Sequence, residues 1–215
     1  MYRAEGRVVA FARAAGSGNT VQPPPAEPES TAGAPAAGGQ PHVLEWNRRS
    51  PVSAQSVLLE CRSLMGGLES AIVVFASSRD NRAFHEAPAG YIEETVDTGL
   101  KGYMFLLREL LGYFQKTGSG TLAVAVHDEG SEILSPVEAC VSASFAALVQ
   151  SLAVFYQNEP VSIAGFRSST TQVNEYAQFI RRTLEEKQGR TAGVWHKYSD
   201  RSGFFQSLPR GILKK

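Results

Sequence analysis

The apolar positions of the chain follow two different periods. Unbroken apolar runs are typical of strands buried on both faces of a parallel sheet, and they occur at Ser70–Ala76, Thr121–Val126 and Val161–Phe166. Apolar positions at helical spacing predict helices at Ala54–Met65, Glu93–Gln115, Pro136–Tyr156 and Thr171–Lys187. Shorter patterns predict strands at Arg7–Arg13, His42–Trp46 and Ala192–Tyr198. Ser53 is the expected cap of the first helix, and Gly66-Gly67 its expected end.

Strands that alternate with helices predict a Rossmann-like α/β fold. We expect a doubly wound, mostly parallel sheet with helices on both faces and a truncated first strand–helix–strand unit. The predicted organisation is an N-terminal strand (residues 1–13), a linker (residues 14–41) and an α/β body (residues 42–215) within one domain. The linker is mostly alanine, glycine and proline and includes Pro23-Pro24-Pro25, which favours an extended connection over a helix.

Composition narrows the class of protein. The 215 residues contain 21 lysines and arginines and 21 aspartates and glutamates, for a net charge of zero. A nucleic-acid partner or an anionic membrane surface usually requires a basic excess, so neither is expected. We identify no uninterrupted run long enough for a transmembrane helix and no signal-peptide pattern, and therefore expect a cytoplasmic protein. The two cysteines, Cys61 and Cys140, are too few for a disulfide scaffold or a four-cysteine zinc site.

The order of several motifs resembles the short-chain dehydrogenase/reductases between His42 and Tyr198. GGLESAIVVFASS (66–78) resembles the fourth strand of that family and its Asn-Asn-Ala-Gly loop, and GLKGYMFLLRELLGYF (99–114) resembles its central helix. GSGTLAVAVHDEG (118–130) resembles the strand that carries the catalytic serine, and SPVEACVSASFAALVQSLAVFY (135–156) resembles the helix of the Tyr-x-x-x-Lys motif. The chain is slightly short for this family.

The catalytic positions implied by the resemblance hold the wrong residue types. A tyrosine must exchange a proton with the substrate, and a lysine one turn later must lower its pKa. Here these two positions are Val141 and Phe145, the serine position is His127, and the helix asparagine position is Gly99. None of the seven tyrosines has a lysine four or seven residues later. The resemblance therefore implies the fold without the hydride-transfer chemistry.

The glycine-rich turn of a dinucleotide site is also incomplete. A dinucleotide site needs a strand, a glycine-rich turn and a helix whose N-terminus faces the pyrophosphate. Gly16-Ser17-Gly18 follows a strand pattern, but the chain then runs into the prolines. We therefore expect no NAD(P) binding. We predict that the first strand occupies the central place of the sheet with His42–Trp46 beside it. The alternative is that it keeps the family's second position and that a gap or a partner chain completes the sheet.

Other candidate groups have simpler interpretations. His127, alone or with Asp128 and Glu129, could act as an acid, a base or a ligand. The favoured interpretation is that they are simply polar residues at the end of a strand. Cys140 is read as a small core thiol, and His85–Glu86 lacks a third metal ligand, so no metal is expected. The basic residues Arg210, Lys214 and Lys215 are read as a solvated terminus.

The resemblance also implies a dimer through the two long helices, with five candidate contacts: Tyr103, Met104, Leu107, Phe145 and Leu148. The first hypothesis is an inactive structural, regulatory or binding subunit, paired with itself or with a related reductase. The second is a divergent enzyme that uses His127, Asp128 or Cys140. The third is a small-molecule-binding module in the former active-site cleft.

Overall fold

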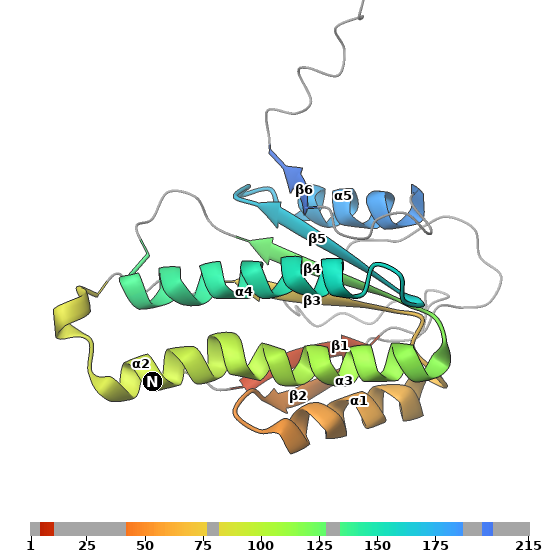
Figure 1. The fold of residues 1–215 in the computed structure, drawn as a ribbon, viewed down its shortest axis with the longest axis horizontal. Helices are drawn as coiled ribbons and strands as arrows, with labels where there is room; N and C mark the ends of the chain where they lie inside the picture. The colour runs from red at the N-terminus through yellow and green to blue at the C-terminus, as the bar shows by residue number, and fades with distance from the viewer. Residues whose placement is uncertain (1–4, 11–41, 77–81, 128–133, 187–194, 200–215) are drawn as a thin grey trace, which may run out of the picture.

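The computed structural model describes residues 5–10, 42–76, 82–127, 134–186 and 195–199. Four parallel strands form the central sheet in the order β3-β4-β5-β6: β3 (Ser70–Ala76), β4 (Gly120–His127), β5 (Val161–Ser168) and β6 (Trp195–Tyr198). Figure 1 shows these strands running side by side behind the long helices. The expectation of a doubly wound parallel α/β fold is confirmed for this part of the chain.

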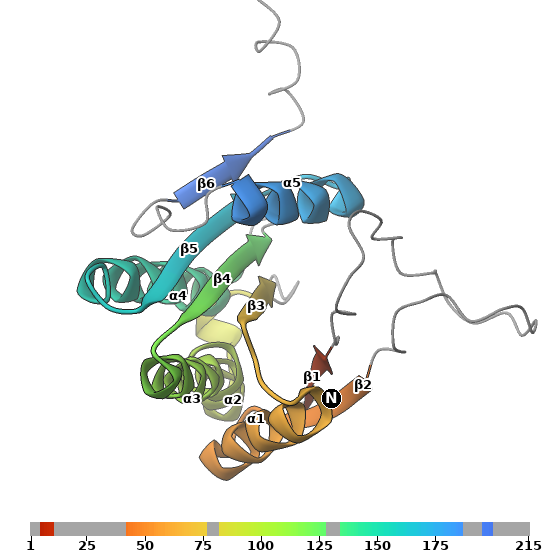
Figure 2. The same cartoon turned by 90° about the vertical axis from the view of Figure 1, so that its right-hand side faces the viewer.

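Helices cover both faces of the sheet (Figure 2). One face carries α1 (Pro51–Met65), α3 (Gly102–Thr117) and α4 (Pro136–Phe155), and the other carries α5 (Val173–Glu186). Alternate residues of β4 face the two layers, as the pleat requires: Leu122, Val124 and Val126 pack toward α3 and α4, whereas Ala123 and Ala125 pack toward α5. The larger core therefore lies on the side of α1, α3 and α4.

The expected central place of the first strand is wrong. Strand β1 (Glu5–Ala10) pairs antiparallel with β2 (His42–Asn47), from Glu5↔Asn47 to Ala10↔His42. This pair is a separate two-stranded sheet, and β3 is an edge of the four-stranded one. Strand β2 does lie beside β1, as expected, but the pair has no ladder to the four-stranded sheet. Among the described residues, the arrangement therefore matches the alternative in which a gap is left next to β3.

The predicted helix boundaries needed adjustment at their N-termini. Helix α1 begins three residues earlier than expected because Ser50, not Ser53, is its cap and accepts a hydrogen bond from the Ser53 amide at 3.2 Å. Its end at Gly66 is confirmed, since this residue has φ 73°, a conformation that glycine adopts without strain. Gly118 ends α3 in the same way.

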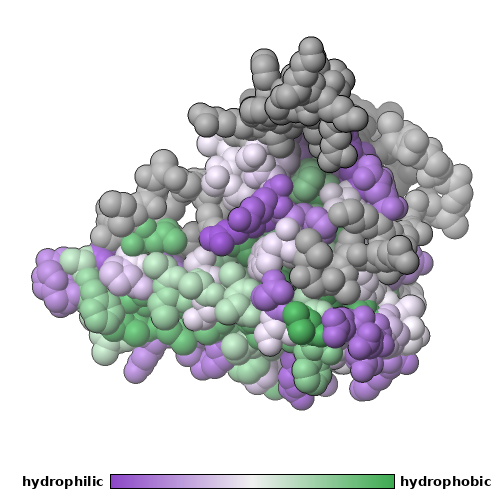
Figure 3. Space-filling model, turned by 45° about the horizontal axis from the view of Figure 1, so that its top comes forward, coloured by the Kyte–Doolittle hydropathy of each residue, from purple (hydrophilic) through white to green (hydrophobic). Residues whose placement is uncertain are grey.

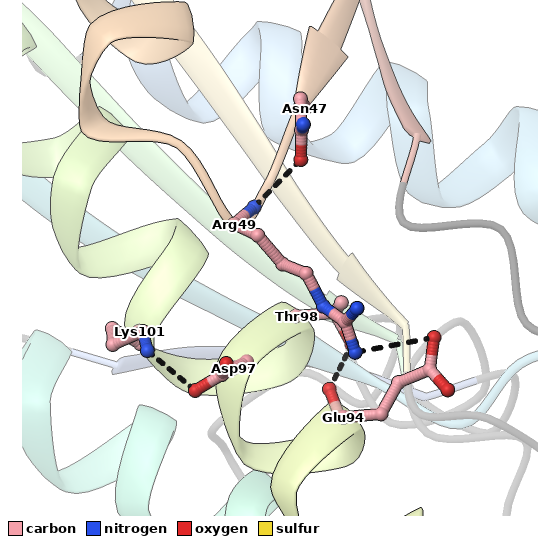
Figure 4. Close-up of polar contacts among 6 residues, drawn as sticks. All are labelled: Asn47, Arg49, Glu94, Asp97, Thr98 and Lys101. Atoms are coloured by element: carbon pink, nitrogen blue, oxygen red, sulfur yellow. Dashed lines mark hydrogen bonds and ion pairs between the residues drawn. The ribbon is translucent and has the colours of Figure 1, made fainter.

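The predicted helix at Glu93–Gln115 is longer and not uniform. It consists of α2 (Ala89–Val96), a π-helical turn, η2 (Asp97–Lys101), and α3. A short 3₁₀ turn, η1 (Phe84–Glu86), precedes it. Within this stretch, the Thr98 hydroxyl donates to the Glu94 carbonyl at 2.7 Å, and Lys101 pairs with Asp97 (Figure 4).

The turn between β2 and α1 contacts both α2 and the start of α3. The Arg49 guanidinium lies 3.6 Å from the Glu94 carboxylate, and the Arg49 amide donates to the Asn47 side chain at 3.0 Å (Figure 4). The Arg48 carbonyl lies so close to Gly102 that a Cβ there would approach it to 2.6 Å. These contacts attach the β1–β2 hairpin to the start of α3, next to the positions of the candidate site.

One described helix, α4, is long and apolar enough by length and composition to cross a membrane, which the sequence analysis did not identify. In this fold one face of α4 is buried: Val141, Phe145, Val149 and Ala153 belong to the main core. A core helix of a soluble protein passes the same test of length and composition.

Candidate functional site

Three of the four implied catalytic positions come together between η2, α4 and β3. Gly99 lies in the π-helical turn and Val141 in α4, and a Cβ on Gly99 would lie 2.8 Å from the Val141 Cγ1. This contact is too close for any other residue without a shift of its neighbour. The positions implied for asparagine and tyrosine are therefore in direct apolar contact, and neither provides a polar atom from its side chain.

The third position, Phe145, is fully buried. Its ring stacks on Phe75 with centroids 4.4 Å apart and planes 15° apart, and it lies 5.1 Å from the Tyr103 ring. Trp46 packs edge-on against Tyr103 at 5.7 Å. These four residues, Trp46, Phe75, Tyr103 and Phe145, are called the aromatic cluster below. Each is at most 4% exposed, so the space where the resemblance implies a lysine is filled by packed rings.

Tyr103 is the only phenol of the aromatic cluster, and it is engaged structurally. Its hydroxyl donates to the Val74 carbonyl at 3.1 Å. Burial raises the pKa of the Tyr103 phenol, and the Arg48 guanidinium, 5.2 Å from the ring centroid, opposes that rise. A proton-transfer tyrosine needs a lowered pKa and access to substrate, so Tyr103 does not replace the missing tyrosine.

His127 is separated from the other three positions. It follows Val126 at the end of β4 and therefore belongs to the face of the sheet that α5 covers, opposite α4. Its Nε2 lies 2.8 Å from the Thr170 carbonyl, which can only accept, so this nitrogen carries the proton. The ring lies 6.2 Å from that of Tyr176. His127 thus fixes the loop after β5 and does not face Val141 or Phe145.

The remaining candidates form no cluster in the described structure. Cys140 is exposed on α4, not buried as expected, whereas Cys61 is buried and its thiol pKa is raised by burial and by Glu60. His85 and Glu86 form an exposed pair at 3.8 Å. Among the described residues, no group of three potential ligands could hold a metal ion. Asp128, Glu129, Gly16–Gly18, Arg210, Lys214 and Lys215 lie outside the described residues.

A polar group of Tyr91, Ser135 and Glu138 lies at the start of α4. The sequence analysis does not single out these three residues. Ser135 caps α4 and accepts a hydrogen bond from the Glu138 amide at 3.3 Å, and the Tyr91 hydroxyl lies 3.1 Å from the Ser135 hydroxyl. Ser135 and Glu138 have the spacing of a capping box, which was the sequence signal available. This group joins α2 to the start of α4, and its role is structural.

A groove of about 590 Å³ crosses the outer surface of α1, α3 and α4. Of the five expected interface residues, Met104, Leu107 and Leu148 line it, and Met104 is 40% exposed. Tyr103 and Phe145 are buried in the core and do not line the groove, and Leu107, which does line it, is only 1% exposed. A partner on this face would therefore meet Met104 and Leu148 but not the aromatic cluster.

The outward face of α4 continues this surface. Its exposed residues carry no charge: Ala139, Cys140, Ala143, Ala147, Ser151, Val154 and Phe155. Figure 3 shows a mostly green, apolar band across the left half of the view, over the region of α4. A surface helix normally presents charged or polar residues to water, so this face has the composition of a contact surface.

No family model matches the sequence, and no curated protein matches it. Solved structures do match. A short-chain dehydrogenase from Mycobacterium smegmatis aligns with a TM-score of 0.63 and 14% identity, over 73% of this chain and 68% of that one. A metagenomic short-chain oxidoreductase in complex with NADP aligns with a TM-score of 0.61 and 10% identity, over 72% of each chain. The fold is that of the short-chain dehydrogenase/reductases.

A third structure with this fold is the 3-ketoacyl-(acyl-carrier-protein) reductase of Brucella melitensis complexed with NADH. It aligns with a TM-score of 0.56 and 11% identity, over 71% of this chain and 74% of that one. Among eight of the solved structures that match, the chain spans between 51% and 80% of their lengths. At such identities the similarity shows the short-chain dehydrogenase/reductase fold and leaves the chemistry to be argued from the residues.

Proposed function

We propose that this chain is a member of the short-chain dehydrogenase/reductase family that has lost hydride transfer and acts as a structural, regulatory or binding subunit. The observation that carries the proposal is the burial of Phe145 against Phe75 at 4.4 Å. A lysine at this place would be an unpaired charge within the aromatic cluster, which is strongly unfavourable. Val141 and Gly99, in contact beside it, provide no acid, base or anchor for a water molecule.

The described residues do not fit a nicotinamide dinucleotide. NADH and NADP accompany two of the structures that share the fold, but the position that the resemblance implies for the ribose-holding lysine is Phe145, whose ring stacks on Phe75. No buried polar side chain of the aromatic cluster is left to contact a ribose hydroxyl except the indole nitrogen of Trp46, because the Tyr103 hydroxyl is bonded to Val74. The proposal therefore includes no NAD(P) cofactor.

Calorimetric titration of the full chain with NADH and NADPH tests this proposal. We expect no saturable heat with either dinucleotide up to millimolar concentration. Micromolar binding of either one would overturn the proposal, whether or not turnover is found. Tryptophan fluorescence gives an independent readout, because Trp46 lies in the aromatic cluster.

The proposed assembly is a dimer through α3 and α4, either with a second copy or with a related reductase. The uncharged outward face of α4 and the adjacent groove support it. Met104 and Leu148 are the two expected interface residues that remain accessible or partly accessible. The same proposal places the protein in the cytoplasm.

A second candidate function rests on His127. With Nε2 bonded to the Thr170 carbonyl, its Nδ1 is the nitrogen that can accept a proton or bind a ligand. A divergent enzyme or a small-molecule-binding module would use it on the α5 side of the sheet, not beside Val141 and Phe145. Turnover that is lost in His127→Ala, or a ligand found by native mass spectrometry of the purified protein, would favour this candidate over the inactive subunit.

A further inference from the structure

The floor of the groove across α1, α3 and α4 contains a glycine that no described contact requires. Gly112 lies inside α3 and lines the groove, and no atom lies within 4 Å of the position that its Cβ would take. Glycine in a helix interior is less favourable than alanine, and it is useful where another chain approaches the main chain closely. The open space at Gly112 is called the notch below.

Cationic side chains lie around the notch. Arg108 and Lys116 lie one helical turn before and after Gly112, so all three share one ridge of α3, and both cations line the groove. Arg62 lines it from the neighbouring helix α1. The one carboxylate among the described lining residues is that of Glu109, 3.4 Å from the Arg108 guanidinium. The groove therefore has a cationic excess, although the chain as a whole has no net charge.

The sides of the groove are apolar. Leu59 on α1 is 53% exposed and Met104 on α3 is 40% exposed, and Leu148 and Leu152 line the side formed by α4. A contiguous apolar surface bordered by polar residues is typical of a binding site. Together with the cations, this surface is complementary to a large apolar side chain with a carboxylate on either side.

The groove is formed by helices, which decides the kind of segment that fits it. Figure 1 shows α4, α3 and α1 one below another in front of the sheet. The main-chain groups inside a helix are bonded within that helix, so this surface offers no ladder to a strand. It accepts the side chains of another helix instead. Arg108 and Lys116 are two turns apart, about 12 Å, which is also two turns of an incoming helix.

A second copy does not match this chemistry. In a two-fold contact the same surface meets itself, so a copy seated in the groove would bring Arg62, Arg108 and Lys116 against the same three cations. The exposed residues of its α4 face carry no charge and provide no carboxylate. The occupant with complementary charge is therefore a different segment.

The segments of this chain outside the described residues do not match it either. Residues 200–215 contain four cations and one acid, and residues 187–194 contain two cations and no acid. Residues 11–41 contain six prolines, which favour an extended chain over a helix. Residues 128–133 are acidic, but they join β4 to Ser135, and Leu148 lies about 20 Å further along α4. A six-residue connection held at both ends extends only about 10 Å.

We propose that the groove binds an acidic, amphipathic helix of another protein. A large apolar side chain of that helix fills the notch, and its carboxylates one turn to each side pair with Arg108 and Lys116. This inference goes beyond the proposed function and does not rest on the loss of hydride transfer. None of the exposed residues of the uncharged α4 face lines the groove, so a second copy on that face and a helix along α3 occupy neighbouring surfaces.

Two matched peptides test the inference on the full chain. The probe is a blocked, alanine-rich helical peptide of about 18 residues, with leucines along one face and a glutamate one turn before and one turn after the central leucine. The control has lysine in place of both glutamates. We expect saturable binding of the probe by calorimetry, at least about tenfold weaker binding of the control, and a shift of the Met104 methyl signal in NMR with the probe. Equal binding of both peptides, or no binding of the probe, contradicts the inference.

Three substitutions locate the binding. Gly112→Leu fills the notch, Lys116→Glu reverses a groove charge, and Arg182→Glu makes the same charge change at an exposed position of α5. We expect probe binding to weaken at least about tenfold with Gly112→Leu, at least about fivefold with Lys116→Glu and less than about twofold with Arg182→Glu. Lys116→Glu should also strengthen binding of the lysine control. Circular dichroism checks folding, and equal effects of the two charge reversals would contradict binding in the groove.

Three further outcomes would assign the groove to another occupant and overturn the inference. Shielding of the Met104 methyl group from a soluble paramagnetic agent in dilute, monomeric protein would show that the chain covers its own groove. Shielding that appears only as protein concentration rises would show that a second copy does so. Binding to anionic lipid vesicles but not to the probe would assign the surface to a lipid. Failure of the proposed function is measured separately, by the titration with NADH and NADPH.

Discussion

At the scale of single residues, the positions that the resemblance implies to be catalytic are packing positions. Phe145 is fully buried and stacks on Phe75, while Val141 fills the space beside Gly99. The substitutions are mutually consistent, since an aromatic ring in place of a lysine is stable only if its surroundings are also apolar. The aromatic cluster therefore contributes to stability at the place where the resemblance implies a catalytic lysine.

Phe145→Ala is expected to lower the free energy of unfolding by about 3–5 kcal/mol, because it removes a fully buried ring. Phe155→Ala is the matched control on the same helix: Phe155 is 78% exposed, and its loss should change stability by about 0.5 kcal/mol or less. Urea denaturation measures both. A similar cost for the two variants would contradict the packing role of Phe145.

Stability should fall at alkaline pH because of Tyr103 and Cys61. Burial raises the pKa of both groups in the folded state, so their neutral forms favour folding. This contribution is complete below the unfolded-state pKa values of about 8.5 for cysteine and 10 for tyrosine, and is lost as pH rises above them. Urea denaturation at intervals from pH 7 to pH 11 measures the loss.

Tyr103→Phe and Cys61→Ala identify the groups responsible. Tyr103→Phe should flatten the decline above about pH 10, and Cys61→Ala should flatten the part that begins near pH 8.5. Both variants should be less stable at pH 7, the first because it leaves the Val74 carbonyl without its partner. An unchanged alkaline profile in both variants would show that other groups govern it.

At the scale of elements, the π-helical turn η2 places a glycine against α4. A Cβ at Gly99 would lie 2.8 Å from Val141, which requires the two elements to approach closely. The contacts around Arg49, Glu94 and Thr98 hold the adjoining turns in place (Figure 4). The joint between α2 and α3 is therefore fixed by packing as well as by hydrogen bonds.

Gly99→Ala should destabilise the protein by about 1–3 kcal/mol through overpacking, despite the higher helix propensity of alanine. Gly112→Ala is the matched control in α3, since no atom lies within 4 Å of its expected Cβ, and it should be neutral or stabilising. In a double-mutant cycle, Val141→Ala should relieve much of the cost of Gly99→Ala. Additive effects in thermal denaturation would contradict the contact.

At the scale of the whole molecule, one surface stands out in a protein whose overall charge is zero. The groove across α1, α3 and α4 and the adjacent uncharged outward face of α4 support the proposed dimer.

Ala147→Arg should disrupt the proposed dimer. Ala147 is exposed in the middle of the uncharged face of α4, so arginine is tolerated in a monomer but would place like charges across a two-fold interface. Sedimentation velocity should show a dimer for the natural chain and for Ala177→Arg, an equivalent change at an exposed position of α5, and a monomer for Ala147→Arg. A monomeric natural chain would contradict self-association.

Local sequence signals determined much of the fold. The apolar runs identified β4 and β5 because a strand buried on both faces has no polar alternation. The same pattern located β3, but its expected burial on both faces is wrong, since Ile72 and Val74 are 54% and 58% exposed. Gly66 marked the end of α1 because it adopts a positive φ. The residue types at Val141 and Phe145 also led to the hypothesis that the implied chemistry is absent, since neither side chain can carry a proton.

Only the tertiary structure decided how these residues meet. It placed His127 on the α5 side of the sheet, away from Val141, because strand alternation reverses with each residue. It paired β1 with β2 instead of β3. It also buried Tyr103, although the helix periodicity alone allowed this side chain to face either the core or a partner. These outcomes depend on contacts between residues far apart in the chain, and such contacts are set by the packing of whole elements.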